Sequence, residues 1–221
     1  DYFFTASPED DLSAVIRPRT SPLLREVETT EGIRHVWCTF SHDQVDLDFR
    51  NPKVLKQFVS IIRQYLDHGV RIFRLDAVAF LWKTLGTVSQ NEREAHLILQ
   101  LMKDCSQVTA PGVLFIAEAI VAPVEIIKYF GEDAVIAKEC EIAYNATFMA
   151  LLWEAVATKN AKLLDQGIRS LPDKLDRATW LNYVRCHDDI GLGFDDADII
   201  RAGYEPAAHR RFLVDWFTGG Y

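Results

Sequence analysis

The sequence predicts an α/β fold built on a parallel sheet, and two observations carry this prediction. Short β-rich runs alternate with longer stretches in which apolar residues recur every three or four positions, as strands and amphipathic helices do. Such alternation gives right-handed βαβ units and hence a parallel sheet. Three of the predicted strands run into a carboxylate, at Asp76, Glu118 and Asp188. These acids are therefore expected at one edge of the sheet, where the carboxyl ends of parallel strands meet.

The first part of the chain is expected to be irregular. Pro8, Pro18 and Pro22 and a turn ending at Gly32 break any long period between residues 1 and about 45. One strand is predicted there, over residues 34–40. This part is expected to form an elaborated loop or a small subdomain and not a self-sufficient domain.

The first helix and the strand that follows it have clear boundary signals. Asn51 is a favourable N-cap, Pro52 suits the first helical position, and Gly69 suits the C-terminal end. The strand over residues 70–73 follows directly. Arg74 and Asp76, two positions apart, are expected to project from the same face of its carboxyl end.

The remaining elements repeat this alternation. Helices are predicted over residues 91–108, 123–130, 148–157, 161–170, 197–202 and 206–216, and strands over residues 113–116, 141–145 and 179–184.

Composition and charge restrict the class of protein. The chain has 221 residues, of which 49% are hydrophobic and 25% charged, as expected of a globular protein with a sizeable core. A net charge of -8 argues against nucleic acid or an anionic membrane as partners. No signal peptide and no apolar run of membrane-spanning length is visible. The four widely spaced cysteines are expected to be free thiols in a reducing compartment, the cytoplasm.

The three acids suit the chemistry of a retaining glycosidase, which needs a carboxylate nucleophile and a carboxylic acid about 5 Å apart. Arg74 favours the ionised form of Asp76, which makes Asp76 the candidate nucleophile. The apolar neighbours of Glu118 are expected to raise its pKa, as a general acid requires. Asp188 could stabilise the positive charge of the transition state. Two alternatives stay open: a structural ion pair between Arg74 and Asp76, and a divalent metal held by acids such as His187-Asp188-Asp189.

Four motifs at these residues resemble the α-amylase family of glycoside hydrolases and transglycosylases. VRIFRLDAVAF (70–80), LFIAEAIV (114–121) and NYVRCHDDIG (182–191) resemble the family's motifs at barrel strands four, five and seven. QVDLDFRNP (44–52) resembles its accessory motif at the end of the inserted subdomain. The resemblance implies part of a (β/α)8 TIM barrel, about strands four to seven. It also implies Asp76 as nucleophile, Glu118 as acid/base and Asp188 as transition-state stabiliser.

Within this family the chain resembles the sucrose-acting branch, and amylosucrases most of all. AVAFLWKTLGT (77–87) and HDDIG (187–191) carry this likeness. The resemblance implies cleavage of sucrose or a related α-glucoside and transfer of the glucosyl unit to a glucan or to water. The substrate-binding residues that it implies are Arg74, His187, Phe40, Phe80 and Asp189. It implies no cofactor and a carbohydrate as the partner.

The resemblance covers the later part of the family's catalytic domain. Residues 1–45 are expected to be the end of the subdomain inserted after strand three, and residues 46–221 a partial barrel with the loop region after strand seven. The family's strand-three motif is absent from this sequence. We therefore expect a fragment of a larger enzyme, inactive in isolation, whose open sheet edges favour self-association.

Three alternatives to the amylosucrase interpretation remain from the sequence. The first is a sucrose phosphorylase, which transfers the glucosyl unit to phosphate. The second is a non-catalytic binding module of the same fold. The third, and weakest, is a metal-dependent barrel enzyme. A separate implication of the resemblance is that Asp46 and Asp48 could bind Ca²⁺, as related positions do in some amylases, although the sucrose branch generally lacks that ion.

Overall fold

The computed structural model describes residues 2–131, 138–173, 176–188 and 190–220. Its elements in chain order are β1 (Leu24–Thr29), β2 (Gly32–Trp37), α1 (Pro52–Asp67), β3 (Ile72–Leu75), η1 (Val78–Phe80), α2 (Arg93–Thr109), β4 (Leu114–Ala117), α3 (Pro123–Ile126), η2 (Ile127–Phe130), β5 (Ile142–Tyr144), α4 (Ala146–Thr158), α5 (Lys162–Arg169), β6 (Thr179–Leu181), α6 (Asp196–Arg201) and α7 (Pro206–Thr218).

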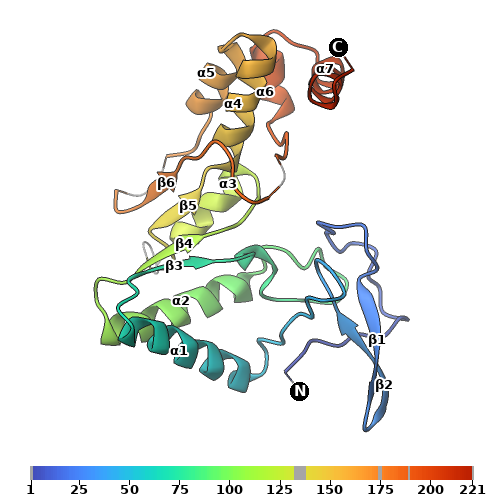
Figure 1. The fold of residues 1–221 in the computed structure, drawn as a ribbon, viewed down its shortest axis with the longest axis vertical. Coiled ribbons are helices and arrows are strands. Elements are labelled where there is room, and N and C mark those ends of the chain that lie inside the picture. Colours follow the sequence, from blue (N-terminus) through green and yellow to red (C-terminus); the bar gives the residue numbers. More distant parts are fainter. Residues whose placement is uncertain (1, 132–137, 174–175, 189, 221) are drawn as a thin grey trace.

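The centre of the molecule is a four-stranded sheet in the order β3-β4-β5-β6, and each neighbouring pair is parallel. Figure 1 shows the four strands rising in sequence order, with α1 and α2 beside β3 and β4. The predicted parallel α/β sheet is confirmed. Strands β5 and β6 are shorter than predicted. Strand β3 has the predicted length but begins at Ile72 instead of Val70, so that Arg74 lies inside the strand.

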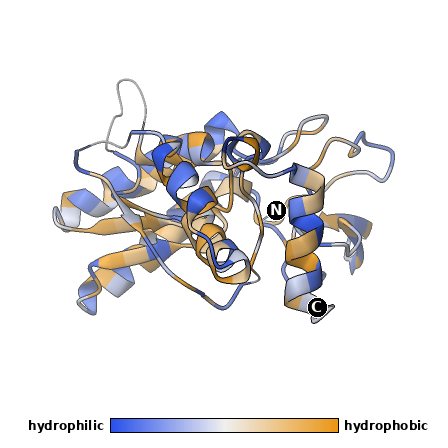
Figure 2. Cartoon of the chain, turned by 90° about the horizontal axis from the view of Figure 1, so that it is seen from above, coloured by the Kyte–Doolittle hydropathy of each residue, from blue (hydrophilic) through white to orange (hydrophobic). Residues whose placement is uncertain are grey.

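The main core lies between this sheet and the helices that pack on it. It contains buried residues of α1, α2, β4 and the α3–η2 segment, among them Leu66, Leu99, Phe115 and Tyr129. Figure 2 shows the strands coloured mainly as hydrophobic, while the helices carry both hydrophobic and hydrophilic residues. This is the pattern expected of helices that cover one face of a sheet and turn the other side to solvent.

The boundaries of α1 follow from its end residues. The Asn51 side chain accepts a hydrogen bond of 3.0 Å from the backbone N–H of Lys53, and Pro52 takes the first helical position. Gly69, just past the end, has φ +91°, a left-handed conformation that glycine adopts without steric cost. Both predicted ends of this helix are confirmed. None of the helices in the described part of the chain combines the length and hydropathy needed to cross a membrane.

The N-terminal part holds more regular structure than the sequence predicted. β1 and β2 form an antiparallel hairpin whose turn joins Thr29 to Gly32. β2 was predicted, although it ends at Trp37 and not at residue 40, but its partner β1 was missed. The missed strand, LREVET, is mostly solvent-exposed, so it lacks the alternation of apolar and polar residues by which a half-buried strand is recognised.

Helices α4 to α7 form a second layer with its own small core, including Leu151, Leu163, Ile199 and Leu213. Figure 1 places these helices beyond β5 and β6, at the end of the molecule opposite the hairpin. A pair of titratable side chains is buried between two of these helices: Glu154 of α4 and His209 of α7, with 3.1 Å between Glu154 Oε1 and His209 Nε2.

Burial disfavours the charged form of both partners. It raises the pKa of Glu154 to about 7 and lowers the pKa of His209 below its usual value. The pair is therefore held as a neutral carboxylic acid beside a neutral imidazole over part of the neutral pH range.

We predict that Glu154 makes the chain less stable as pH rises from about 4.5 to about 7. The folded state keeps a proton that the unfolded state releases across this window, so the free energy of unfolding falls by up to about 3 kcal/mol. His209, with its lowered pKa, acts in the opposite direction as pH falls. Urea unfolding at about pH 5 and about pH 8 measures the fall. This fall in the free energy of unfolding should be smaller in Glu154→Gln and unchanged in the exposed control Glu28→Gln. An equal fall in Glu154→Gln would show that Glu154 is not the group responsible.

Candidate active site

The structure brings the three acids to one cleft. Asp76 directly follows β3, Glu118 directly follows β4, and Asp188 lies in the segment after β6. All three line a cleft of about 830 Å³ at the carboxyl end of the sheet. In parallel α/β folds this end of the strands is where ligands bind.

Asp76 is paired with Arg74. Arg74 Nη1 lies 2.5 Å from Asp76 Oδ1, and Arg74 Nε donates to the hydroxyl of Tyr144 at 3.2 Å. Since Tyr144 ends β5, the guanidinium is held between two strands while it contacts the carboxylate. The Asp76 side chain is 69% exposed, so it remains open to the cleft. This geometry fits both the predicted nucleophile and the simpler structural ion pair.

Glu118 is buried beside Asp76. Its Oε2 accepts a hydrogen bond of 2.8 Å from the backbone N–H of Ala77, the residue after Asp76. Only 9% of the residue is exposed. Burial raises the pKa of Glu118, and the negative charges of Asp76 and Asp188 add to this, while the Ala77 N–H and Arg74 oppose it. The raised pKa that its apolar neighbours predicted is confirmed.

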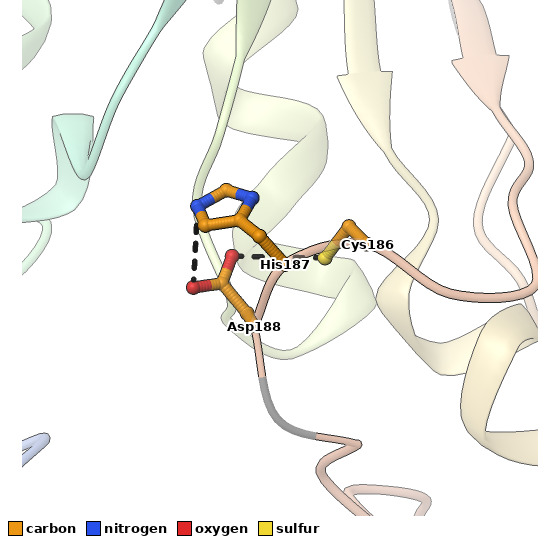
Figure 3. A group of neighbouring side chains, drawn as sticks. All are labelled: Cys186, His187 and Asp188. Atoms are coloured by element: carbon orange, nitrogen blue, oxygen red, sulfur yellow. Dashed lines mark hydrogen bonds and ion pairs between the residues drawn. The ribbon is translucent and has the colours of Figure 1, made fainter.

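His187 and Asp188 lie side by side at the cleft, and both line it. His187 Nε2 lies 3.5 Å from Asp188 Oδ1 (Figure 3). The His187 side chain is 71% exposed and that of Asp188 29%, so both reach solvent in the cleft. Asp189, also predicted to bind substrate, lies outside the described residues.

The two predicted aromatic residues meet at the same cleft. Phe40 follows β2 and Phe80 ends η1, and their ring centroids are 5.5 Å apart in an edge-to-face arrangement. Both line the cleft. They form an apolar wall of the cleft, which suits a sugar ring with one apolar face.

The sequence interpretation missed several residues of the cleft, among them Arg19, Gln44 and Gln90. These polar side chains stand on irregular segments, where no periodicity marks a residue as facing a site. Among the described residues that line the cleft, Arg19 and His187 are the ones that can carry positive charge.

The two acids considered for Ca²⁺ are engaged by protein cations. Asp46 Oδ2 lies 2.5 Å from Lys83 Nζ, and Asp46 also accepts from the Thr39 hydroxyl at 2.6 Å. Asp48 pairs with Arg50 at 2.8 Å. Asp46 and Asp48 therefore already have cationic partners, and the lysine takes the place at Asp46 that a metal would need.

Lys83 contacts the backbone of Phe80, one of the two aromatic residues at the cleft. Its side chain is 4% exposed, and its ammonium donates to the carbonyl oxygen of Phe80 at 2.7 Å. Burial lowers the pKa of Lys83, while the charges of Asp46 and Asp48 oppose that shift. The Asp46–Lys83 pair thus connects the segment after the hairpin to η1.

Comparison with known proteins identifies the family of the chain. Residues 28–192 match the family described as "Alpha amylase, catalytic domain". The chain is 37% identical over 193 residues to the glucosylglycerate phosphorylase of Escherichia coli, covering 87% of this chain and 34% of that protein. It is 31% identical over 156 residues to the trehalose synthase/amylase of Mycolicibacterium smegmatis, covering 71% of this chain and 26% of that one.

A solved structure supports the fold. The sucrose 6F-phosphate phosphorylase of Thermoanaerobacter thermosaccharolyticum superposes with a TM-score of 0.72 at 20% identity, covering 91% of this chain and 42% of that one. The chain belongs to the α-amylase family of carbohydrate-active enzymes, and its sheet and helices are part of a (β/α)8 barrel, as the sequence predicted. It spans about a third of the length of the curated relatives.

We predict that Lys83→Met destabilises the chain by about 3 kcal/mol, because it leaves the Asp46 carboxylate buried without its cation. Urea unfolding of Lys83→Met, Asp46→Asn and the double variant measures the coupling between the two charges. The double variant should lose less than the sum of the single losses. Arg169→Met, which breaks an exposed pair in α5, should cost less than about 1 kcal/mol. Additive losses at positions 46 and 83 would show that the pair contributes no coupling.

Proposed function

We propose that the chain carries the catalytic acids of a retaining enzyme that acts on α-glucosides. The observation that carries the proposal is that Asp76, Glu118 and Asp188, from three parallel strand ends, line one cleft. Asp76 attacks the anomeric carbon and forms a covalent glucosyl-aspartate. Glu118 gives its proton to the leaving oxygen and takes one from the acceptor in the second step. Asp188 and His187 contact the sugar, and the Asp188 charge stabilises the oxocarbenium-like transition state.

The surroundings of each acid support its role. Arg74, held by Tyr144, contacts Asp76, and this contact keeps the proposed nucleophile oriented. Burial keeps a proton on Glu118 to higher pH than on an exposed glutamate, as a general acid requires. Phe40 and Phe80 exclude water from one side of the cleft. Asp189 is proposed as a further sugar contact on the sequence resemblance alone.

We propose phosphate as the acceptor of the glucosyl unit. Support comes from the relatives, glucosylglycerate phosphorylases at 36% and 37% identity, and from Arg19, a guanidinium at the cleft. Guanidinium groups bind phosphate well because their donors match its oxygens. The amylosucrase-like alternative, transfer to a glucan or to water, remains the second candidate on the motifs at residues 77–87 and 187–191.

The domain division is proposed on the same resemblance: residues 1–45 as the end of an inserted subdomain and residues 46–221 as the partial barrel. Phe4, Leu23 and Trp37 form a separate small core, which supports a distinct N-terminal unit. Asp46 stays attached to that unit through backbone hydrogen bonds with Phe4 and Trp37, each of 2.9 Å. Self-association through the outer edges of β3 and β6 is proposed as well.

We predict that Asp76 is the residue glucosylated by a 2-fluoro-glucosyl fluoride. The fluorine slows release of the intermediate, and fluoride leaves without an acid. In a protein that contains the complete barrel, the adduct should therefore form with the native residues and with Glu118→Gln but not with Asp76→Asn. Intact mass, followed by peptide mapping, measures the adduct. For a natural glucoside, each of the two variants should lower kcat by at least about 1,000-fold. An adduct in Asp76→Asn would refute the assignment of Asp76 as the nucleophile. Absence of an adduct on the folded protein would mean that the three acids are present without a complete substrate pocket.

We predict that inorganic phosphate diverts the glucosyl unit to glucose 1-phosphate. Arg19→Ala should raise the KM for phosphate by at least about 10-fold, because one charge-assisted contact is worth about 1.5 to 3 kcal/mol. Hydrolysis without phosphate should change little. Arg34→Ala, an exposed arginine of the hairpin paired with Glu31, is the matched control. Release of glucose or growth of a glucan, unaffected by phosphate, would favour the amylosucrase-like alternative.

A further inference from the structure

Three consecutive side chains after β6 converge, and the first of them, Cys186, has no part in the proposed glycosidase chemistry. Cys186, His187 and Asp188 each offer one ligand atom, and these atoms lie within 4.8 Å of one another. Figure 3 shows the thiol and the imidazole on either side of the Asp188 carboxylate. Cys186 Sγ lies 3.6 Å from Asp188 Oδ2, and His187 Nε2 lies 3.5 Å from Asp188 Oδ1.

These donors and spacings suit Zn²⁺. A thiolate, an imidazole and a carboxylate are its usual protein ligands, at about 2.3, 2.0 and 2.1 Å. In a tetrahedron with those bond lengths, neighbouring ligand atoms stand about 3.3 to 3.6 Å apart. The sulfur and the nitrogen stand at these separations from the Asp188 carboxyl group, but from its two different oxygens. The three ligand atoms lie within 4.8 Å of one another, so side-chain rotations are needed to bring them around one ion.

The backbone that carries the cluster is held just before it. The ring of Tyr183 packs edge-on against Tyr144 of β5 at 5.1 Å. The carbonyl oxygen of Val184 accepts a hydrogen bond of 2.8 Å from Trp153 Nε1 of α4. The cluster therefore begins two residues after an anchored point, which lowers the conformational entropy lost when a metal binds.

The surrounding charge also favours a cation. Asp76 and Glu118 line the same cleft as His187 and Asp188. A divalent cation at the cluster reduces this concentration of negative charge.

We propose that Cys186, His187 and Asp188 form a Zn²⁺ site with three protein ligands and a fourth position open to the cleft. On binding, the Cys186 thiol releases its proton and the thiolate bonds the metal. His187 and Asp188 line the cleft, so the ion and a sugar compete for the same side chains, and the site is inhibitory. Binding of the metal does not depend on the proposed function, because it is detected without turnover; the inhibition rests on the proposed function.

The test is a titration of the reduced chain with Co²⁺, which takes zinc sites and shows a near-ultraviolet thiolate charge-transfer band. The band should appear, bleach on addition of Zn²⁺, and vanish in Cys186→Ser. Cys105→Ser, which removes the other partly exposed thiol, is the matched control and should keep the band. Zinc affinity should fall by at least about 100-fold in Cys186→Ser, since outer partners of ligands alone account for about 10- to 100-fold.

His187→Gln provides a second variant whose thiol is intact. It should weaken Zn²⁺ binding while Co²⁺ at high concentration still gives a thiolate band. Absence of any band in the parent chain, or a band that survives Cys186→Ser or is lost in Cys105→Ser, would overturn the proposal. Circular dichroism of each variant shows that a lost band does not reflect lost folding.

Discussion

The register between β3 and β4 is the constraint on which the site depends. Leu75 stands opposite Ala117 in this parallel pair, so the next residues on each strand, Asp76 and Glu118, leave the sheet side by side. A one-residue slip would turn one of the two carboxyl groups to the other face. The register is specified by Phe73 of β3 and Phe115 of β4, which also stand opposite each other and pack edge-to-face at 6.1 Å. The packing of the two phenylalanine rings thus fixes the relative position of the two carboxyl groups that follow them on the strands.

The sequence predicted those parts of the molecule in which local pattern and tertiary role agree. Helix α1, capped by Asn51 and Gly69, and the order of strands and helices after it follow from periodicity and capping chemistry. The three acids could be predicted to converge because strand polarity alone brings carboxyl ends together. Such features depend on neighbours in the chain, which the sequence displays.

The rest depends on contacts between distant segments. The strand β1 was missed because it is held by pairing with β2 and not by burial of its own side chains. Arg19 reaches the cleft from a segment without regular structure, and the partnership of Lys83 with Asp46 joins positions that no periodicity relates. The amylosucrase interpretation rested on short motifs around shared catalytic residues, and such motifs say little about which acceptor follows the first step.

Ala77 has a further consequence for Glu118, the proposed acid/base residue. It adopts φ +51°, a left-handed conformation that costs a residue with a Cβ about 1 kcal/mol, and in it the Ala77 amide donates to Glu118. A carboxylate accepts such a bond more strongly than a carboxylic acid does. The peptide that joins Asp76 to Ala77 is therefore held more firmly when Glu118 is ionised than when it carries a proton.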